Sequence, residues 1–200
     1  MTAEIWNIWN ESGGPKYPQE KVIQFCFRRF SPEIRSETKV LDLGCGSGVH
    51  CIFLAREGFQ VTGTDISEIG VANTKEKLST LELKADIYVE AADLLNFAPS
   101  TFDCVICIGV YDSAGYAVAK NSIPRVSEIL KKGGCGFFLF ASDRDFRVKG
   151  ENPLGLHGYS QSEVDKMFRN TFSKVYIDRY ITTYQNRTIE QNDWLITVEK

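Results

Sequence analysis

The chain has 200 residues, of which 43% are hydrophobic and 24% charged, and its formal net charge is −3. This length and composition are typical of one globular domain with a substantial apolar core. The slightly acidic balance disfavours a nucleic-acid partner, because the longest basic cluster is only the pair Arg28-Arg29.

Six cysteines are spread along the chain without the spacing of a disulfide framework. Cys104 and Cys107 have C-x-x-C spacing, but they lie in an apolar, strand-like run, where residues three apart face opposite sides. We therefore expect reduced, buried thiols and no metal site. No hydrophobic run reaches the length of a membrane span, and the first residues lack a signal-peptide pattern. These features predict a cytoplasmic protein with no membrane contact.

The first 17 residues combine Trp6, Trp9 and Tyr17 with a glycine-proline break at 13–15. Two interpretations are open: these aromatic side chains cap an exposed side of the core, or they form a lid over a ligand site. We favour the lid. Tyr17 is the residue that we expect to touch the ligand, because Pro15 and Pro18 restrict where its ring points.

A helix is predicted from Pro18 to Ser31-Pro32, because its apolar residues share one face. We therefore divide the single domain into an amino-terminal helical extension, residues 1–35, and a catalytic core, residues 36–200.

From residue 39 onward, strand-like and helix-like segments alternate, which predicts a parallel sheet with right-handed crossovers. Strands are expected near residues 39–43, 60–65, 85–91, 102–109, 135–141, 173–183 and 192–199. Helices are expected near residues 47–57, 67–80, 116–131 and 160–170. Pro124 predicts a kink or break near Ser122. The last two strands are close enough in sequence to pair antiparallel.

The most informative stretch is residues 40–50, Val-Leu-Asp-Leu-Gly-Cys-Gly-Ser-Gly-Val-His, which predicts a strand, a tight turn and a helix. Such a turn approaches a nucleotide-like ligand closely at a helix N-terminus. The dinucleotide fingerprint requires glycine where Val49 stands, and no P-loop lysine is present. Asp42 would repel a pyrophosphate and favours a ligand with positive charge. S-adenosylmethionine, with its sulfonium and ammonium groups, is such a ligand.

The run from Val40 to Gly48 resembles the first signature motif of class I S-adenosylmethionine-dependent methyltransferases. Later segments resemble the other motifs of this family in the same order: 61–67, 92–94, 102–109 and 130–140. The resemblance covers residues 38–142. It implies an α/β domain of three layers, with a Rossmann-like sheet of seven strands that is mostly parallel with an antiparallel last strand, and helices on both faces.

The resemblance also implies a set of cofactor-binding residues. The glycine turn would hold the methionine end, Asp65 the ribose hydroxyls and Asp93 the adenine amine, with Ile66 packed beside the adenine. The full set is Asp42, Gly44, Cys45, Gly46, Gly48, Asp65, Ile66, Asp93, Leu94, Ile108 and, from the lid, Tyr17. The implied cofactor is S-adenosylmethionine, with S-adenosylhomocysteine as its product.

Catalytic candidates lie on loops that follow the fourth and fifth strands. A base is needed only if the methyl acceptor is protonated, and the tentative candidates are His157 and Tyr111. Some related enzymes hold a divalent metal with acids at about the places of Asp112 and Asp143, but no adjacent second acid or amide completes such a set here.

The acceptor is not readable from the sequence, although a small molecule fits best. The N/D/S-P-P-Y/F tetrapeptide of amine-directed nucleic-acid methyltransferases is absent, and Gly109-Val-Tyr-Asp112 stands in its place. Two other functions stay open. One is a cofactor-binding but catalytically silent partner subunit. The other is a nicotinamide-dependent oxidoreductase, which Val49 and Asp42 disfavour.

Overall fold

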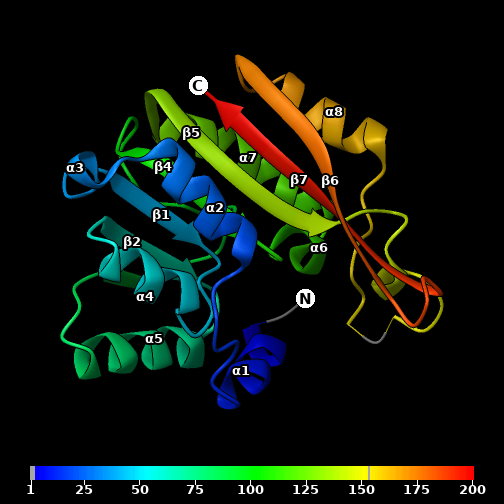
Figure 1. Cartoon of the computed structure of the whole chain (residues 1–200), viewed down its shortest axis with the longest axis horizontal. Helices are drawn as coiled ribbons and strands as arrows, with labels where there is room; N and C mark the ends of the chain where they lie inside the picture. Colours follow the sequence, from blue (N-terminus) through cyan, green and yellow to red (C-terminus); the bar gives the residue numbers. More distant parts are fainter. Residues whose placement is uncertain (1–2, 153) are drawn as a thin grey trace.

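The computed structural model describes residues 3–152 and 154–200. Its centre is a seven-stranded sheet in the order β3-β2-β1-β4-β5-β7-β6 (Figure 1). The strands are β1 (Lys39–Leu43), β2 (Gln60–Asp65), β3 (Asp86–Val89), β4 (Phe102–Ile108), β5 (Leu130–Ala141), β6 (Lys174–Tyr184) and β7 (Ile189–Glu199).

The first five strands pair in parallel, whereas β7 pairs antiparallel with both β5 and β6. This topology confirms the predicted fold class. The strand order reverses between β1 and β4, and in open sheets of this kind ligands bind at the carboxyl ends of strands beside such a reversal.

Helices cover both faces of the sheet. Their bounds are α1 (Ala3–Glu11), α2 (Glu20–Arg29), α3 (Pro32–Arg35), α4 (Val49–Arg56), α5 (Glu68–Thr80), α6 (Tyr111–Ala114), α7 (Tyr116–Ile129) and α8 (Gln161–Arg169), with a short 3-10 helix η1 (Phe146–Val148). In Figure 1, α2 and α4 lie in front of the sheet and α7 lies behind it. None of the described helices is long and apolar enough to cross a membrane.

Two apolar clusters fill the space between the sheet and its two helical layers. Cys104 and Ile106 of β4 point into the cluster beneath α2, α4 and α5, whereas Val105 and Cys107 point into the cluster beneath α7 and α8. The prediction that Cys104 and Cys107 face opposite sides is therefore confirmed, and the described chain has six free, buried cysteines.

Helix α7 departs from the sequence prediction at Pro124. The helix runs without interruption from Tyr116 to Ile129, so a break near Ser122 is wrong, whereas a kink there stays a prediction. Ser122, Ile123 and Ile129 on this helix are buried in the core, which holds the helix together although Pro124 lacks the N–H of one helical hydrogen bond.

Candidate functional site

The turn after β1 requires glycine at two positions. Gly44 (φ 75°) and Gly48 (φ 83°) adopt backbone conformations that residues with a side chain rarely take. A Cβ added to Gly44 would lie 2.2 Å from Cγ2 of Val110, and one on Gly48 would lie 2.6 Å from Oγ1 of Thr74. A Cβ on Gly46 would lie 3.5 Å from Oδ1 of Asn10, an ordinary contact distance, so the middle of the turn lies against the side chain of a residue in α1.

Asp65, at the end of β2, is bound to this turn. Its Oδ2 accepts a hydrogen bond from the backbone N–H of Gly46 (2.8 Å), and its Oδ1 accepts one from the backbone N–H of Ser67 (2.8 Å). Burial raises the pKa of Asp65, while these backbone donors act in the opposite direction. The two bonds hold an acidic side chain between the carboxyl ends of β1 and β2.

Asp42 lies beneath the turn and is only 1% exposed. Its Oδ2 accepts a hydrogen bond from Sγ of Cys51 (3.2 Å), and its Oδ1 lies 4.0 Å from Nδ1 of His50. Burial lowers the pKa of His50, whose Nε2 accepts a hydrogen bond from the backbone N–H of Gln19 (3.1 Å), so this imidazole is neutral. Asp42 can therefore influence a ligand through its electrostatic potential but not by direct contact.

Apolar side chains are exposed where β2 and β3 end. Ile66 follows β2 and Leu94 lies after β3, and Leu94 is 72% exposed. Asp93 is half-buried beside Leu94, and Ile108 ends β4. Because β3, β2, β1 and β4 are neighbours in a parallel sheet, these residues lie along one edge of the sheet together with the glycine turn.

Helix α1 is attached to the same edge by asparagine side chains, which the sequence analysis overlooked. Oδ1 of Asn10 accepts a hydrogen bond from Oγ of Ser47 in the glycine turn (2.7 Å), and the backbone carbonyl of Asn10 accepts one from Nδ2 of Asn73 (2.7 Å). Oδ1 of Asn7 accepts a hydrogen bond from Oγ of Ser67 (2.7 Å). The signal in the sequence was two asparagines three residues apart on one face of a short amphipathic helix.

The aromatic residues of the amino-terminal segment are largely accessible. Trp9 is 52% exposed and packs edge-to-face on Trp6, and Tyr17 is 83% exposed. Neither Trp9 nor Tyr17 belongs to an apolar core cluster, so the core-capping interpretation is wrong for both. The lid interpretation stays a prediction.

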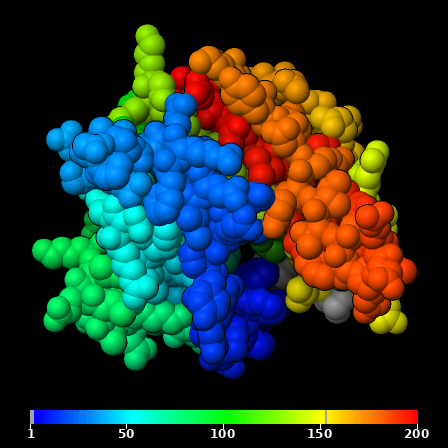
Figure 2. Space-filling model, viewed as in Figure 1, coloured from blue at the N-terminus to red at the C-terminus, as the bar shows by residue number. Residues whose placement is uncertain are grey.

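The space-filling view shows the surface hollowed between α1 and the hairpin of β6 and β7 (Figure 2). The carboxyl ends of β1 and β4 point toward this hollow (Figure 1). The hollow, which we call the cleft, therefore lies between the hairpin and α1, the helix that is hydrogen-bonded to the glycine turn.

Tyr111, a tentative catalytic residue, does not reach this cleft. Its side chain is fully buried, its hydroxyl lies 3.0 Å from Oγ of Ser122, and its ring stacks on Phe138. The sequence places Tyr111 directly after β4, but the chain turns at Gly109 (φ 68°) and α6 directs the ring into the core. The catalytic assignment of Tyr111 is therefore wrong.

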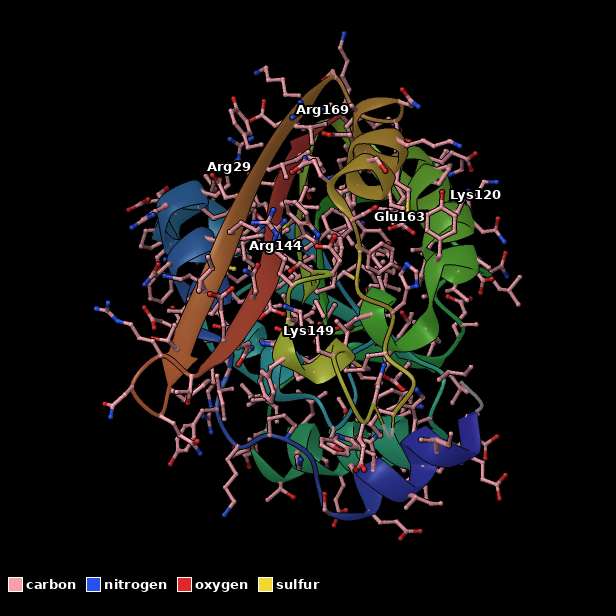
Figure 3. The ribbon with its side chains drawn as sticks, turned by 90° about the vertical axis from the view of Figure 1, so that its right-hand side faces the viewer. Arg29, Lys120, Arg144, Lys149, Glu163 and Arg169 are labelled. Carbon is pink, nitrogen blue, oxygen red and sulfur yellow. The ribbon has the colours of Figure 1, made fainter. Side chains whose placement is uncertain are left out.

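His157 has structural partners that the sequence did not indicate. Its Nε2 lies 3.0 Å from Oε1 of Glu163, and its backbone N–H donates to the carbonyl of Asp112 (2.7 Å). Its ring packs against Tyr116 and Tyr159. Figure 3 shows Glu163 at the start of α8, beside α7. The imidazole is half-buried, and its catalytic role stays a prediction.

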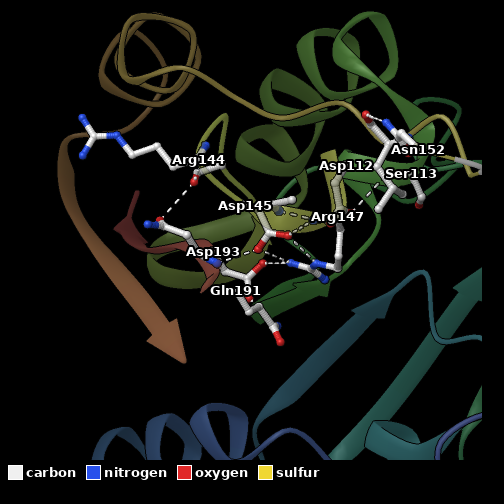
Figure 4. Close-up of polar contacts among 12 residues, drawn as sticks. Asp112, Ser113, Arg144, Asp145, Arg147, Asn152, Gln191 and Asp193 are labelled. Carbon is white, nitrogen blue, oxygen red and sulfur yellow. Dashed lines mark hydrogen bonds and ion pairs between the residues drawn. The ribbon is translucent and has the colours of Figure 1, made fainter. Parts of the chain in front are cut away.

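The loop after β5 is fixed by a group of buried charges that sequence reasoning also missed (Figure 4). Asp145 is fully buried and accepts hydrogen bonds from Nε (2.8 Å) and one terminal nitrogen (3.0 Å) of Arg147. Arg147 also pairs with Asp193 on β7, and the backbone N–H of Asn192 donates to Asp145. The loop is therefore held against β7, beside the cleft.

Asp112 lies close to this group and is directed inward. Its Oδ2 accepts a hydrogen bond from the backbone N–H of Ala141 (3.1 Å), and its Oδ1 accepts one from that of Ser113 (3.0 Å). Burial raises the pKa of Asp112 to about 6. Asp143 is exposed, and within the described residues no three His, Cys, Asp or Glu side chains are grouped as metal ligands.

The sequence that forms this arrangement matches a known protein family. Residues 40–134, which include the glycine turn and Asp65, match the family model described as a methyltransferase domain. These residues belong to the methyltransferase-domain family, and the whole fold is that of the class I S-adenosylmethionine-dependent methyltransferases. The methyltransferase fold extends beyond the matched segment, because β6, β7 and α8 complete the seven-stranded sheet and its second helical layer.

Among curated proteins, this chain is 30% identical over 144 residues to a Geobacillus protein whose name provisionally assigns it as a methyltransferase. The match covers 69% of this chain and 57% of that protein. It is 26% identical over 171 residues to the ubiquinone biosynthesis O-methyltransferase of Coxiella burnetii. This match covers 80% of this chain and 70% of that enzyme. The chain spans 57% and 44% of the lengths of the Geobacillus protein and of a similarly named Bacillus subtilis protein.

Solved structures share the fold at low sequence identity. The magnesium protoporphyrin IX methyltransferase of Synechocystis, solved with bound S-adenosylhomocysteine, superposes with a TM-score of 0.71 at 18% identity and covers 96% of this chain and 93% of that one. An S-adenosylmethionine-dependent methyltransferase of Methanosarcina mazei gives a TM-score of 0.68 at 21% identity and covers 81% and 92% of the two chains.

Proposed function

We propose that this chain transfers the methyl group of S-adenosylmethionine to a small-molecule acceptor. The observation that carries the proposal is the hydrogen bond between Asp65 and the glycine turn. Asp65, a carboxylate that could accept hydrogen bonds from a ribose, lies at the end of β2 and accepts the backbone N–H of Gly46 in this turn. The relatives named as O-methyltransferase and protoporphyrin methyltransferase support a small-molecule acceptor.

The residues around Asp65 and the glycine turn fit the cofactor chemically. Ile66 and Leu94 offer exposed apolar surface for an adenine, and Asp93 is an acceptor for its amine. The glycine turn suits a cationic methionine end. Burial raises the pKa of Asp42, and the neighbouring His50 is neutral, so a bound cation would favour the ionised form of Asp42 and gain from its negative potential. When bound, S-adenosylmethionine supplies a methyl group that is already activated for in-line displacement.

The chain would then align the acceptor and exclude water. Tyr17 and Trp9 are exposed aromatic surface on the segment that runs beside the glycine turn, and we assign them to covering the bound cofactor. His157 would accept a proton if the acceptor carries one. With Nε2 hydrogen-bonded to Glu163, the other ring nitrogen, Nδ1, would be the basic one.

Two measurements test the proposal. Calorimetric titration should show S-adenosylmethionine and S-adenosylhomocysteine binding with dissociation constants of low-micromolar order, about −8 kcal/mol, and no binding of NAD. Binding of NAD without a response to S-adenosylhomocysteine would favour the oxidoreductase instead. A screen of small hydroxyl, amine and thiol compounds should then yield S-adenosylhomocysteine, whereas cofactor binding with no turnover across the screen would favour the silent partner subunit.

The role of His157 has its own test. His157→Gln should lower kcat on a protonated acceptor by about 10²- to 10⁴-fold and leave the dissociation constant of S-adenosylhomocysteine unchanged. Glu163→Gln is the comparison: it removes the negative charge beside the imidazole but keeps an oxygen acceptor, and it should lower kcat less. Equal, small losses in both variants would mean that the pair only stabilises the start of α8.

A further inference from the structure

A separate cavity of about 280 Å³ lies between α2 and the sheet, away from the candidate site. Phe25 and Phe137 give it an apolar surface, and Arg28 and Arg29 contribute positive charge. Cys135 lies in its wall. Cys135 comes six residues before the carboxyl end of β5, a distance of roughly 20 Å along the strand, so the cavity is not part of the methyl-transfer cleft.

Two further thiols lie behind Cys135. In the parallel pairing of β4 with β5, Cys104 is the direct partner of Cys135, and both point into the apolar cluster that also contains Cys26 of α2. Neighbouring strands are about 4.8 Å apart, which is within the Cα separation that a disulfide can span. Cys104 and Cys26 are 0% and 1% exposed, so Cys135 is the member of the group that a small reagent can reach.

The charges around Cys135 favour its thiolate. Its pKa is lowered, first by a hydrogen bond from the thiol of Cys104 and then by the guanidinium of Arg29, against the effect of burial. Arg29 pairs with Glu199 at 2.9 Å, which weakens but does not cancel its effect.

Cys45 provides an internal comparison for the environment of the Cys135 thiol. Cys45, in the glycine turn, is 5% exposed and Cys135 is 4% exposed. A hydrogen bond with Cys51 acts to lower the pKa of Cys45, but burial and then the carboxylates of Asp42 and Asp65 outweigh it, so the pKa is raised. Equal exposure with opposite electrostatics should therefore give different reactivity.

We propose that Cys135 is a nucleophilic thiol that takes up small electrophiles and hydroperoxides through the α2 cavity, and that Cys104 resolves the oxidised form. In the first step the thiolate sulfur attacks one oxygen of the hydroperoxide, the O–O bond breaks, and the leaving oxygen takes a proton, which gives Cys135 sulfenic acid and water or an alcohol. In the second step the Cys104 thiol attacks the sulfenic sulfur and releases water, which leaves a Cys104–Cys135 disulfide. The thiols lose two electrons and the hydroperoxide gains them.

Labelling of the folded, full-length chain with iodoacetamide tests the first part. Peptide mapping should find Cys135 modified before the other five cysteines, including Cys45. Arg29→Met, which keeps an apolar stem but removes the charge, should slow this labelling by roughly tenfold, the effect of one pKa unit on the thiolate fraction. Arg28→Met, on the same helix and lining the same cavity, is the matched control and should change the rate by less than about threefold. Glu199→Gln should accelerate labelling.

Oxidation with a small excess of hydrogen peroxide tests the second part. Digestion without reductant should yield a Cys104–Cys135 cross-linked peptide that dithiothreitol separates. In Cys104→Ser, Cys135 should instead be trapped by dimedone as a sulfenic acid, whereas Cys26→Ser should still form the cross-link. The proposal is wrong if Cys45 labels as fast as Cys135 or if Arg29→Met and Arg28→Met behave alike. The resolving role is wrong if the unaltered chain gives the dimedone adduct without the cross-link.

Discussion

Asn10 and Ser47 join the amino-terminal helix to the glycine turn: the Ser47 hydroxyl donates to Oδ1 of Asn10 at 2.7 Å. Asn10 is 2% exposed, the one buried side chain of α1 among the described residues, and it is polar. The helix is thus held by hydrogen bonds at the edge of the proposed cofactor site, which is an arrangement that can open without unfolding the core.

Asn10→Ala should detach α1 while the core stays folded. Loss of a buried hydrogen-bonding group costs about 1–3 kcal/mol, and we expect this cost to appear as faster amide exchange and proteolysis of residues 3–17. Glu11→Ala, an exposed position on the same helix, should change neither. A fall in the global unfolding midpoint with no local opening would show that α1 is part of the cooperative core.

Tyr17→Ala should separate a ligand contact from a structural role. Because the ring is 83% exposed, the melting temperature of the ligand-free protein should change by less than a degree or so. The affinity for S-adenosylhomocysteine should fall by about tenfold, the equivalent of roughly 1.4 kcal/mol. Deletion of residues 1–17 should likewise spare the fold and abolish most turnover. An unchanged affinity in Tyr17→Ala would remove this residue from the site.

Asp65→Ala should weaken cofactor binding without preventing folding. Loss of hydrogen bonds to a charged group costs about 1.5–3 kcal/mol, so the dissociation constant of S-adenosylhomocysteine should rise roughly tenfold to a hundredfold. Glu68→Ala, three residues along the chain and exposed, is the control. Since Asp65 also binds the backbone of Gly46 and Ser67, circular dichroism must establish that the variant is folded.

Gly44→Ala should lower the unfolding free energy by more than the positive φ of this position alone explains. Gly44 and Gly133 have nearly the same φ, 75° and 76°, but only at Gly44 would the new Cβ meet another side chain, Val110. Gly133→Ala should cost about 1–2 kcal/mol of unfolding free energy from backbone strain. Gly44→Ala should cost about 1–3 kcal/mol more, and Val110→Ala in the same chain should recover part of the excess. Equal losses of unfolding free energy in Gly44→Ala and Gly133→Ala, measured by chemical denaturation, would contradict the close approach of Val110 to Gly44.

Asp112 should make stability depend on pH in a direction opposite to that of a salt-bridged acid. Its pKa is about 6 in the folded chain, above the ordinary value near 3.9, so the folded state binds the proton more tightly. Its contribution to stability is therefore full below about pH 4, is lost as the pH rises to about 6, and stays lost above that. Two pKa units correspond to about 3 kcal/mol.

Asp112→Asn removes this titration. The unfolding free energy of the original chain, minus that of the variant, should therefore be larger at pH 4 than at pH 7 by about 2–3 kcal/mol, which means that the original chain gains stability at low pH. Comparing the two chains cancels the titration of Asp65 and Asp193, whose pKa values burial also raises. A difference that does not change with pH would mean that Asp112 stays ionised or protonated throughout.

The sequence by itself determined the fold and the edge of the sheet at which the proposed cofactor-binding residues lie. Alternating strand and helix patterns are local, and the glycine turn between β1 and α4 needs only residues 44–48 to adopt positive φ at alternate positions. Parallel strands with right-handed crossovers then bring Asp65, Asp93 and Ile108 to one edge, because consecutive strands of a parallel sheet end on the same side.

Only the tertiary structure decided which polar side chains face the cleft and which are buried. Tyr111 and Asp112 follow β4 directly, yet α6 turns both inward, a direction that no periodicity encodes in four residues. The attachment of Asn10 to Ser47 and of Arg147 to Asp193 joins residues 37 and 46 positions apart. Such contacts depend on how separate elements pack, and polar side chains in a sequence carry no signal of the partner that they will find.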